Sequence, residues 1–206
     1  MSTLFYRLEN LTAKYLFMTR RIPTRKKEVF LTFDDGPEKD ITQFILSELN
    51  KYQFKATFFC RGDHAEDHPD LMQQIRSAGH SVGNHTFHHC NAYQTSVKDY
   101  VKDVEKADEI LHTGIFRPPF GCIRLPQLFR LKRNYKLIYW SLDSKDHQSN
   151  IDCIASCIEL LCQSTRPGDI VLFHFSQEHA SHTKAILAPY LDYLSRNGFR
   201  GVPITH

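Results

Sequence analysis

The sequence predicts a single α/β domain in which about seven parallel strands alternate with helices. Three observations support this fold class. Short runs of β-branched and aromatic residues alternate with amphipathic helical patterns about seven times. The length of 206 residues suits one domain with a sizeable core. No composition break or internal repeat interrupts the alternation after residue 27, so the strands are expected to form one sheet, either open or closed into a barrel.

The expected elements follow one another at regular intervals. Strands are expected at residues 29–33, 55–59, 81–84, 114–117, 136–140, 169–175 and 199–204. Apolar residues at helical spacing predict helices around residues 41–49, 71–79, 97–111, 151–161 and 186–194. The chain thus divides into an amphipathic and basic N-terminal segment, residues 1–27, and an α/β domain, residues 28–206.

Composition and charge narrow the function classes. An apolar content of 41% and a charged content of 24% are ordinary for a globular protein, which excludes disordered and fibrous classes. The net charge of +3 is unevenly distributed. Residues 1–27 contain seven Lys or Arg and one Glu, giving +6, whereas the remainder contains nineteen against twenty-two, giving −3. Because the body is mildly acidic, no nucleic-acid partner is expected.

The N-terminal segment has two interpretations. Leu4, Leu8, Leu11 and Tyr15 recur at helical spacing, and a basic cluster follows them. We favour a helix that caps the bottom of the core; the alternative is an interfacial helix in residues 3–27 that contacts an anionic membrane. Here the charges follow the apolar residues, whereas a signal peptide has them in front. We therefore expect a cytoplasmic protein with reduced cysteines, in contact with the inner membrane face under the alternative interpretation.

Two adjacent carboxylates follow the first expected strand. The strand at residues 29–33 carries no charge and runs into Asp34 and Asp35, after which Gly36 and Pro37 break the chain. Parallel α/β folds place their chemistry at the carboxyl ends of strands, so this pair is a candidate site, although the stretch alone also fits a solvated turn. Both side chains can serve one site only if the strand has already ended. Two charges this close then require a cation or a base between them.

Polar residues follow nearly every later strand and are expected to gather at one face. They are His85, His88, His89, Arg117, Asp143, Asp146 and His174. His85 and His89 are four residues apart, so on a helical turn both rings face the same way. With a carboxylate they form a set that suits zinc or another first-row divalent ion. The spacing does not exclude His88, and such a pair is by itself also a common surface feature.

Six segments in chain order resemble the motifs of a known enzyme family. They are Thr32–Pro37, Ala56–Gly62, Gly83–His89, Arg117–Gly121, Trp140–Asp146 and Leu172–His174. In this order they resemble the motifs of the NodB-homology polysaccharide deacetylases, carbohydrate esterase family four. The resemblance covers roughly residues 28–175. It implies a distorted (β/α) barrel of seven or eight βα units, which agrees with the strand count.

The resemblance implies a metal site and a base. Asp34 is similar to the family's general base, Asp35 to its metal carboxylate, and His85 and His89 to its histidine ligands. Thr86 stands where the family uses a hydroxyl to brace the histidine loop. A divalent metal cofactor is therefore expected, with Zn²⁺ favoured over Co²⁺, Ni²⁺ or Mn²⁺.

The same resemblance implies groups that orient the base, stabilise an oxyanion and protonate the leaving group. Arg117 is similar to the residue that holds the base ionised and oriented, and the backbone N–H of Phe120 occupies the oxyanion-donor position. Asp146 is similar to the carboxylate that orients the general acid, here His174. Leu172 is expected to wall the small pocket for the acetyl methyl group.

Four positions depart from the family pattern and make the substrate less defined. Phe120 replaces Tyr, His147 replaces Trp, Cys90 replaces Pro, and Phe175 stands where Asp is common. None of these changes removes a catalytic group.

Other polar and aromatic residues receive plainer interpretations. Trp140 fits either the sheet core or a sugar platform, and Asp143 fits a structural role outside the catalytic set. His179 and His182 are assigned to the surface or the core.

The sequence therefore predicts a metal-dependent hydrolase that removes N-acetyl groups from an amino-sugar glycan or its precursor. An O-acetyl carbohydrate esterase is the alternative within hydrolases, because the same residues can cleave an ester. A catalytically silent carbohydrate- or metal-binding protein is the third hypothesis. The expected partner is an N-acetylated carbohydrate, and the sequence carries no signal for an oligomeric state.

Overall fold

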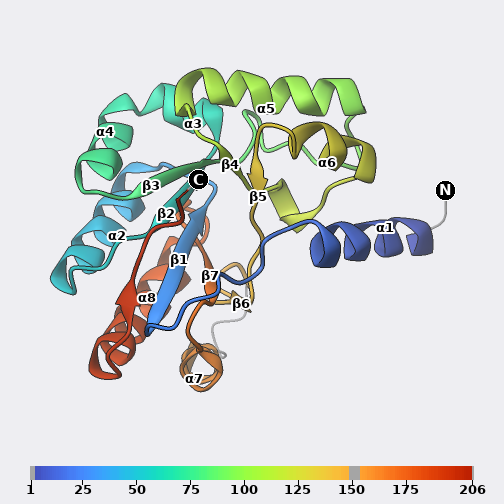
Figure 1. The fold of residues 1–206 in the computed structure, drawn as a ribbon. Coiled ribbons are helices and arrows are strands. Elements are labelled where there is room, and N and C mark those ends of the chain that lie inside the picture. Colours follow the sequence, from blue (N-terminus) through green and yellow to red (C-terminus); the bar gives the residue numbers. More distant parts are fainter. Residues whose placement is uncertain (1–2, 149–153, 206) are drawn as a thin grey trace.

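The fold is a curled parallel sheet surrounded by helices (Figure 1). The computed structural model describes residues 3–148 and 154–205. Its strands are β1 (Glu28–Asp34), β2 (Thr57–Cys60), β3 (Ser81–Asn84), β4 (Ile115–Phe116), β5 (Lys136–Leu137), β6 (Leu142–Asp143), β7 (Ile170–His174) and β8 (Arg200–Gly201). The strand order is β5-β4-β3-β2-β1-β7-β6, with β8 beside the start of β1, and all these pairs are parallel. The predicted distorted (β/α) barrel in a single domain is confirmed.

The helices follow the strands in the expected alternation. They are α1 (Thr3–Leu16), α2 (Lys39–Lys51), α3 (Gly62–Asp67), α4 (Pro69–Ser77), α5 (Val97–Leu111), α6 (Leu125–Leu131), α7 (Ile154–Ser164) and α8 (Ala180–Arg196), with a short 3₁₀ turn at Pro119–Gly121. In the described part of the chain, no helix is both long enough and apolar enough to cross a bilayer.

The centre of the core is β1. Its residues from Val29 to Asp34 are buried, as the apolar run predicts for a strand covered on both faces. The Phe33 ring packs between the rings of Phe58 on β2 and Phe173 on β7, with centroid distances of 5.1 and 5.7 Å. Because β1 has neighbours on both sides, its carboxyl end opens onto the middle of the sheet's carboxyl-terminal edge.

Residues 19–22 run along the sheet between β5 and β7. The Thr19 N–H donates to the Leu137 carbonyl at 2.8 Å, and the Ile22 N–H donates to the Gly168 carbonyl at 2.8 Å. This segment therefore covers the interval between two strands that do not pair with each other. The division of the chain at residue 27 stays a prediction.

The apolar stripe of α1 does not cap the core. Leu8, Leu11 and Tyr15 are exposed, whereas Glu9 and Ala13 on the opposite side of the helix are buried. Figure 1 shows α1 extending away from the sheet next to α6. The favoured interpretation of this stripe as a core-facing surface is therefore wrong, because helical periodicity defines a face but does not say what covers it.

Three short elements were not expected from the pattern, and several expected ones differ in extent. The strands expected at residues 114–117 and 199–204 are shorter, at Ile115–Phe116 and Arg200–Gly201. Helices α3 and α6 and strand β6 lack a long apolar run, and the expected strand at residues 136–140 forms ladder pairs only at Lys136–Leu137. The expected helix at residues 151–161 is seen from Ile154 onward; its first three residues lie outside the described part.

Candidate active site

The carboxyl end of β1 presents both aspartates to one pocket. Strand β1 ends at Asp34, and Asp35 then adopts a left-handed backbone with φ of 86°. This turn removes the strand alternation that would have placed the two side chains on opposite faces. The next residue must be glycine, since a Cβ at Gly36 would lie 2.4 Å from the Phe175 ring. Strand ending and chain turn thus bring the two carboxylates together, as the Gly-Pro pair predicts.

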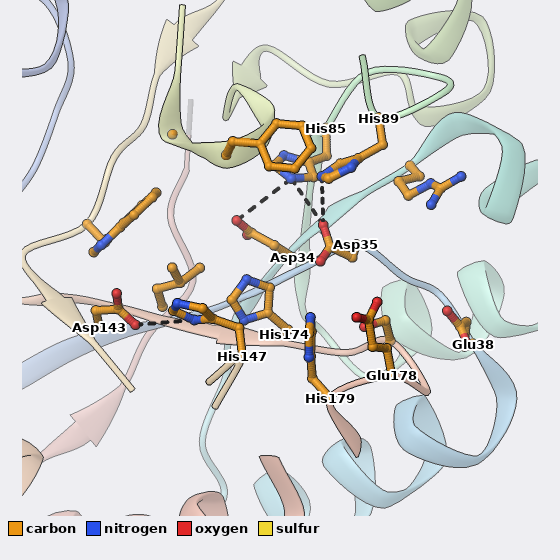
Figure 2. A pocket seen from close by; sticks show the side chains of 16 residues that line it. Asp34, Asp35, Glu38, His85, His89, Asp143, His147, His174, Glu178 and His179 are labelled. Carbon is orange, nitrogen blue, oxygen red and sulfur yellow. Dashed lines mark ion pairs between the residues drawn. The ribbon is translucent and has the colours of Figure 1, made fainter. Parts of the chain in front are cut away.

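Asp35, His85 and His89 form a compact cluster (Figure 2). The Asp35 Oδ1 atom lies 3.3 Å from His85 Nε2 and 3.1 Å from His89 Nε2. Ligand atoms bound to zinc at about 2.0–2.1 Å in a tetrahedron are about 3.3 Å apart. The spacing of these three donor atoms therefore fits a single divalent cation held between them.

The hydrogen bonds of His85 also fit a metal ligand. Its Nδ1 atom lies 2.7 Å from the Arg117 carbonyl oxygen, which can only accept, so Nδ1 carries the proton. Nε2 is then the ring nitrogen that faces Asp35 and is placed to ligate a cation. Burial raises the pKa of Asp35, but hydrogen bonds from His85 and His89 and the charges of His85 and His174 outweigh it and hold this pKa well below its ordinary value. Asp35 is therefore anionic at neutral pH, as a metal ligand must be.

The two histidines converge through a loop and not through the helical turn that their spacing suggested. Residues 85–90 form no helix, and Thr86 and His89 have φ values of 64° and 55°. Non-glycine residues in this left-handed region are uncommon and cluster at functional sites. The Thr86 hydroxyl accepts a hydrogen bond from the Cys90 N–H at 3.2 Å, so it braces the loop as the resemblance implied.

Asp103 on α5 binds the backbone of the same loop, a role that the sequence pattern did not predict. Its carboxylate accepts hydrogen bonds from the backbone N–H groups of Phe87 and His88, at 2.9 and 3.0 Å. The His88 Nδ1 atom lies 2.6 Å from the same carboxylate. His88 therefore points to Asp103 and not to the Asp35 cluster, which settles the ambiguity left by its spacing.

Arg117 lies fully buried beneath Asp34. Its Nη1 donates to the Asp34 carboxylate at 2.7 Å and to the Thr32 hydroxyl at 2.8 Å, and its Nη2 donates to the Tyr139 carbonyl at 3.1 Å. The guanidinium also lies over the Phe59 ring, 4.2 Å from its centroid. These contacts fix the guanidinium, which in turn orients the Asp34 carboxylate toward the pocket.

His174 stands beside Asp34 on the neighbouring strand. The parallel register of β1 and β7 pairs Asp34 with His174. The His174 Nδ1 atom lies 2.7 Å from Asp146 Oδ1, while Asp146 Oδ2 accepts from the His174 backbone N–H and the Thr183 hydroxyl, both at 2.8 Å. Both oxygens of this buried carboxylate are therefore occupied by donors within the protein.

The environment of His174 favours its charged form. Burial lowers the pKa of His174, but the charge of Asp146, its hydrogen bond, and the charges of Asp35 and Asp34 outweigh burial and raise the pKa to about 9. Burial raises the pKa of Asp146, and the charge and hydrogen bonds of His174 outweigh this and lower it. At neutral pH the pair is therefore an imidazolium facing a carboxylate.

A pocket of about 620 Å³ joins these groups. Seven of the nine sequence-predicted site residues line it: Asp34, Asp35, His85, His89, Phe120, Leu172 and His174. The other two, Arg117 and Asp146, lie behind Asp34 and His174 and hold them in place. Figure 2 shows the Asp34, Asp35, His85 and His89 group on one side and His147, His174 and His179 on the other.

The pocket also contains residues that the sequence reasoning assigned elsewhere or did not mention. Trp140 and Asp143 line it, as do Glu38, Arg61, His147, Glu178 and His179. The His147 and His179 rings lie edge-on to the His174 ring at 5.3 and 5.1 Å. His179 immediately precedes α8 and follows the end of β7 by five residues, so proximity to a strand end was the signal that could have found it.

Comparison with known proteins identifies the family. The polysaccharide deacetylase family profile matches residues 21–135. A peptidoglycan-N-acetylglucosamine deacetylase of Bacillus cereus is 30% identical over 196 residues, covering 92% of each chain. A solved peptidoglycan N-acetylglucosamine deacetylase, in complex with 4-naphthalen-1-yl-N-oxidanyl-benzamide, has a TM-score of 0.85 at 31% identity and covers 94% of this chain and 93% of that one. The chain belongs to the polysaccharide deacetylase family, whose named relatives are hydrolases of carbon–nitrogen bonds other than peptide bonds.

A further relative and a further solved structure are similar to this chain to different degrees. A second Bacillus cereus peptidoglycan-N-acetylglucosamine deacetylase is 35% identical over 160 residues, and there the match spans 74% of this chain but only 57% of the relative. A Bacillus anthracis protein described as a pseudoenzyme of carbohydrate esterase family four shares the fold, with a TM-score of 0.78 at 24% identity over 90% of this chain and 66% of that one. The fold is therefore shared with a protein described as a pseudoenzyme, so the fold alone does not establish catalysis.

Proposed function

We propose that the protein is a metal-dependent deacetylase that hydrolyses the N-acetyl groups of an amino-sugar glycan or glycan precursor. The observation that carries this proposal is the meeting of three groups in one pocket: Asp34, the Asp35 cluster and His174. Amide hydrolysis needs a base for water, a stabilised oxyanion and an acid for the leaving nitrogen. The names of the relatives support an N-acetylated sugar as the substrate class.

Asp35, His85 and His89 would hold the divalent cation. Two imidazole nitrogens and one carboxylate oxygen suit zinc, with cobalt, nickel and manganese as alternatives, and leave positions open for substrate. When bound, such a cation polarises the acetyl carbonyl and lowers the pKa of water. His85 would be held in the ligating tautomer by the Arg117 carbonyl.

Asp34 would take the proton of the attacking water. Its Oδ1 atom is held by Arg117, and its Oδ2 atom lies 3.9 Å from His85 Nε2, on the side of the Asp35 cluster. Asp34 is thus fixed in position with one oxygen available to the pocket.

The acetyl group would be oriented by Phe120 and Leu172. Phe120 has φ of 59°, and its ring packs against His89 at 4.6 Å, so the backbone at this position is fixed against the cluster. Its N–H would donate to the oxyanion, a contribution of about 3 kcal/mol when preorganised. Leu172, a buried β7 residue that lines the pocket, would receive the methyl group.

His174 would donate a proton to the leaving amine. An amine leaves poorly as an anion, so the acid must be charged before the carbon–nitrogen bond breaks. The Asp146 carboxylate holds Nδ1–H, which directs the other ring nitrogen and its proton into the pocket. An ester needs this protonation less, because an alcohol leaves more easily than an amine. Surroundings that keep His174 charged therefore favour an amide substrate over the O-acetyl alternative.

The direct test is acetate release from N-acetylglucosamine oligosaccharides by zinc-loaded protein. We expect turnover that a chelator abolishes and zinc restores, and that Asp34→Asn removes without loss of bound zinc. Sugar binding without acetate release across a panel of N-acetylated glycans, with zinc bound, would instead indicate the silent binding protein.

A further inference from the structure

Helix α1 presents an apolar face to solvent. Leu8, Leu11, Tyr15 and Leu16 are 57%, 49%, 57% and 71% exposed, and we call these four residues the α1 outer face. Leu8, Leu11 and Tyr15 recur at the spacing that places side chains on one side of a helix. Single exposed apolar residues are common on proteins, but these three form a stripe, and Leu16 adds exposed apolar surface at the end of the helix.

The opposite side of the helix is attached to the body of the protein. Ala13 and Glu9 are buried, and the Glu9 carboxylate accepts a hydrogen bond from the Leu125 N–H at 2.9 Å. The Asn10 side-chain oxygen accepts from the Ile123 N–H at 3.4 Å. These contacts with residues next to and within α6 fix which side of α1 faces outward.

Positive charge flanks the α1 outer face. The Arg20 guanidinium lies 4.2 Å from the centroid of the Tyr15 ring, and Lys14 Nζ lies 5.7 Å from it. Residues 1–27 carry seven Lys or Arg, and their single acidic residue is the buried Glu9. Arg7 and Lys14 lie on α1 and Arg20 follows it closely, so the charge next to the stripe is basic. Of the later cations, Arg21 pairs with Asp169, Lys26 pairs with Glu28, and Lys27 donates to the Asn197 carbonyl.

We propose that the α1 outer face docks on the surface of an anionic lipid bilayer. An apolar helical stripe bordered by Lys and Arg is the pattern of helices that lie in the membrane interface. The apolar side chains enter the acyl boundary, and the cations attract anionic headgroups. A second copy of the chain fits less well, since two copies of this face would bring like charges together.

The docked helix would stand next to the wall of the pocket. Lys14 Nζ lies 4.2 Å from the centroid of the Tyr139 ring, which stacks on the Trp140 ring at 3.8 Å, and Trp140 lines the pocket. Docking would therefore hold the pocket beside the lipid surface. This points to an acetylated sugar carried on a lipid, a consequence that rests on the proposed function, whereas docking itself does not.

The test is sedimentation of the full chain with vesicles. Vesicles of phosphatidylcholine containing phosphatidylglycerol are compared with vesicles of phosphatidylcholine alone. The test variant is Leu8→Gln/Leu11→Gln/Leu16→Gln, because Gln keeps helix propensity at exposed positions. Leu160→Gln, at an equally exposed leucine on α7, is the matched control. A second variant, Arg7→Gln/Lys14→Gln, removes two charges on α1 itself.

We expect wild type to bind the anionic vesicles. In the triple variant the ratio of bound to free protein should fall at least about tenfold. Each charge removed should cost about fivefold, and the control should bind like wild type. Absence of wild-type binding to anionic vesicles, or equal binding by the triple variant, overturns the proposal. Light scattering that shows a wild-type dimer, made monomeric by the triple variant, overturns it in favour of a second copy.

Two further readouts separate this inference from the proposed function. Acetate release from a soluble oligosaccharide should be the same for wild type and the triple variant, because none of the three leucines touches the pocket. If soluble turnover is absent in wild type, the proposed function fails while docking stands. If soluble turnover is present and vesicle binding is absent, docking fails alone.

Discussion

Two histidine–carboxylate clusters face each other across the pocket. They differ in the groups that donate hydrogen bonds to the carboxylate. In both, ligand atoms of one Asp and two His lie within 4.8 Å of one another: Asp35, His85 and His89 in the first, and Asp146, His147 and His174 in the second. Among the described residues, the ion-pair partners of Asp35 are imidazole nitrogens. Asp146 already accepts hydrogen bonds from the His174 ring, the His174 backbone and Thr183.

This difference assigns opposite chemistry to the same residue types. A cation can replace the protons between Asp35 and its two imidazoles, because no other donor in the described part of the chain satisfies that carboxylate oxygen. At Asp146 the two oxygens are satisfied by the protein, so the carboxylate keeps a proton on His174 and does not act as a metal ligand. The first cluster is therefore expected to bind a metal and the second to supply a proton.

The largest effect is expected from removing a ligand of the first cluster. His89→Asn retains a residue that tolerates the left-handed backbone at this position. Zinc binding measured by calorimetry should be lost, and acetate release should fall by at least about 10⁴-fold. The matched variant in the second cluster, His147→Asn, should bind zinc like wild type. Equal loss of zinc in both variants would remove the distinction between the clusters.

Asp34→Asn should separate catalysis from metal binding. Asp34 lies between the clusters and is held by Arg117, so the amide should keep its place without accepting a proton. We expect acetate release to fall by about 10³-fold with an unchanged zinc affinity. Glycan turnover near the wild-type rate would show that another group acts as the base.

The second cluster is tested by comparing amide and ester substrates. His174→Asn removes the acid, which the amine leaving group needs more than an alcohol does. Hydrolysis of an N-acetyl sugar should fall by about 10²-fold or more, whereas hydrolysis of a matched O-acetyl ester should fall much less. Equal losses on the two substrates would assign His174 a role other than proton donation.

The smallest effect is a shift of the pH profile. The pKa of His174 is raised to about 9, so its charged form is present at neutral pH and is lost as the pH rises through about 9. Amide hydrolysis should therefore decline on the alkaline side, with a midpoint at or below about 9, because a bound cation offsets the charge of Asp35. In Asp146→Asn the midpoint should move down toward the ordinary histidine value. An unmoved alkaline limb would show that it reports a different group.

Much of the site could be predicted because its signals are local. An apolar run that ends in Asp34 and Asp35 predicts the end of a parallel strand, and the structure places both residues there. Parallel topology then predicts that other strand ends converge, and His174 indeed lies beside Asp34 in the register. The direction of the parallel strands alone places these residues at one edge of the sheet, whatever the conformation of the loops.

The parts that could not be predicted depend on tertiary contacts. The left-handed backbone at Thr86, His89 and Phe120 is held by surrounding packing, and residue type does not indicate it. The hydrogen bonds from the histidine loop to Asp103 join positions 15 or 16 residues apart. For α1, periodicity correctly predicted an apolar stripe, but the prediction that this stripe faces the core was wrong. Which side of a helix is buried depends on the elements that pack against it, and periodicity does not contain this information.

The most direct test of the central claim is anomalous scattering at the zinc edge from crystals of the zinc-loaded protein. The account predicts one strong peak within bonding distance of Asp35, His85 and His89, on the side of the pocket facing Asp34. A peak among Asp146, His147 and His174, with none at Asp35, would contradict it.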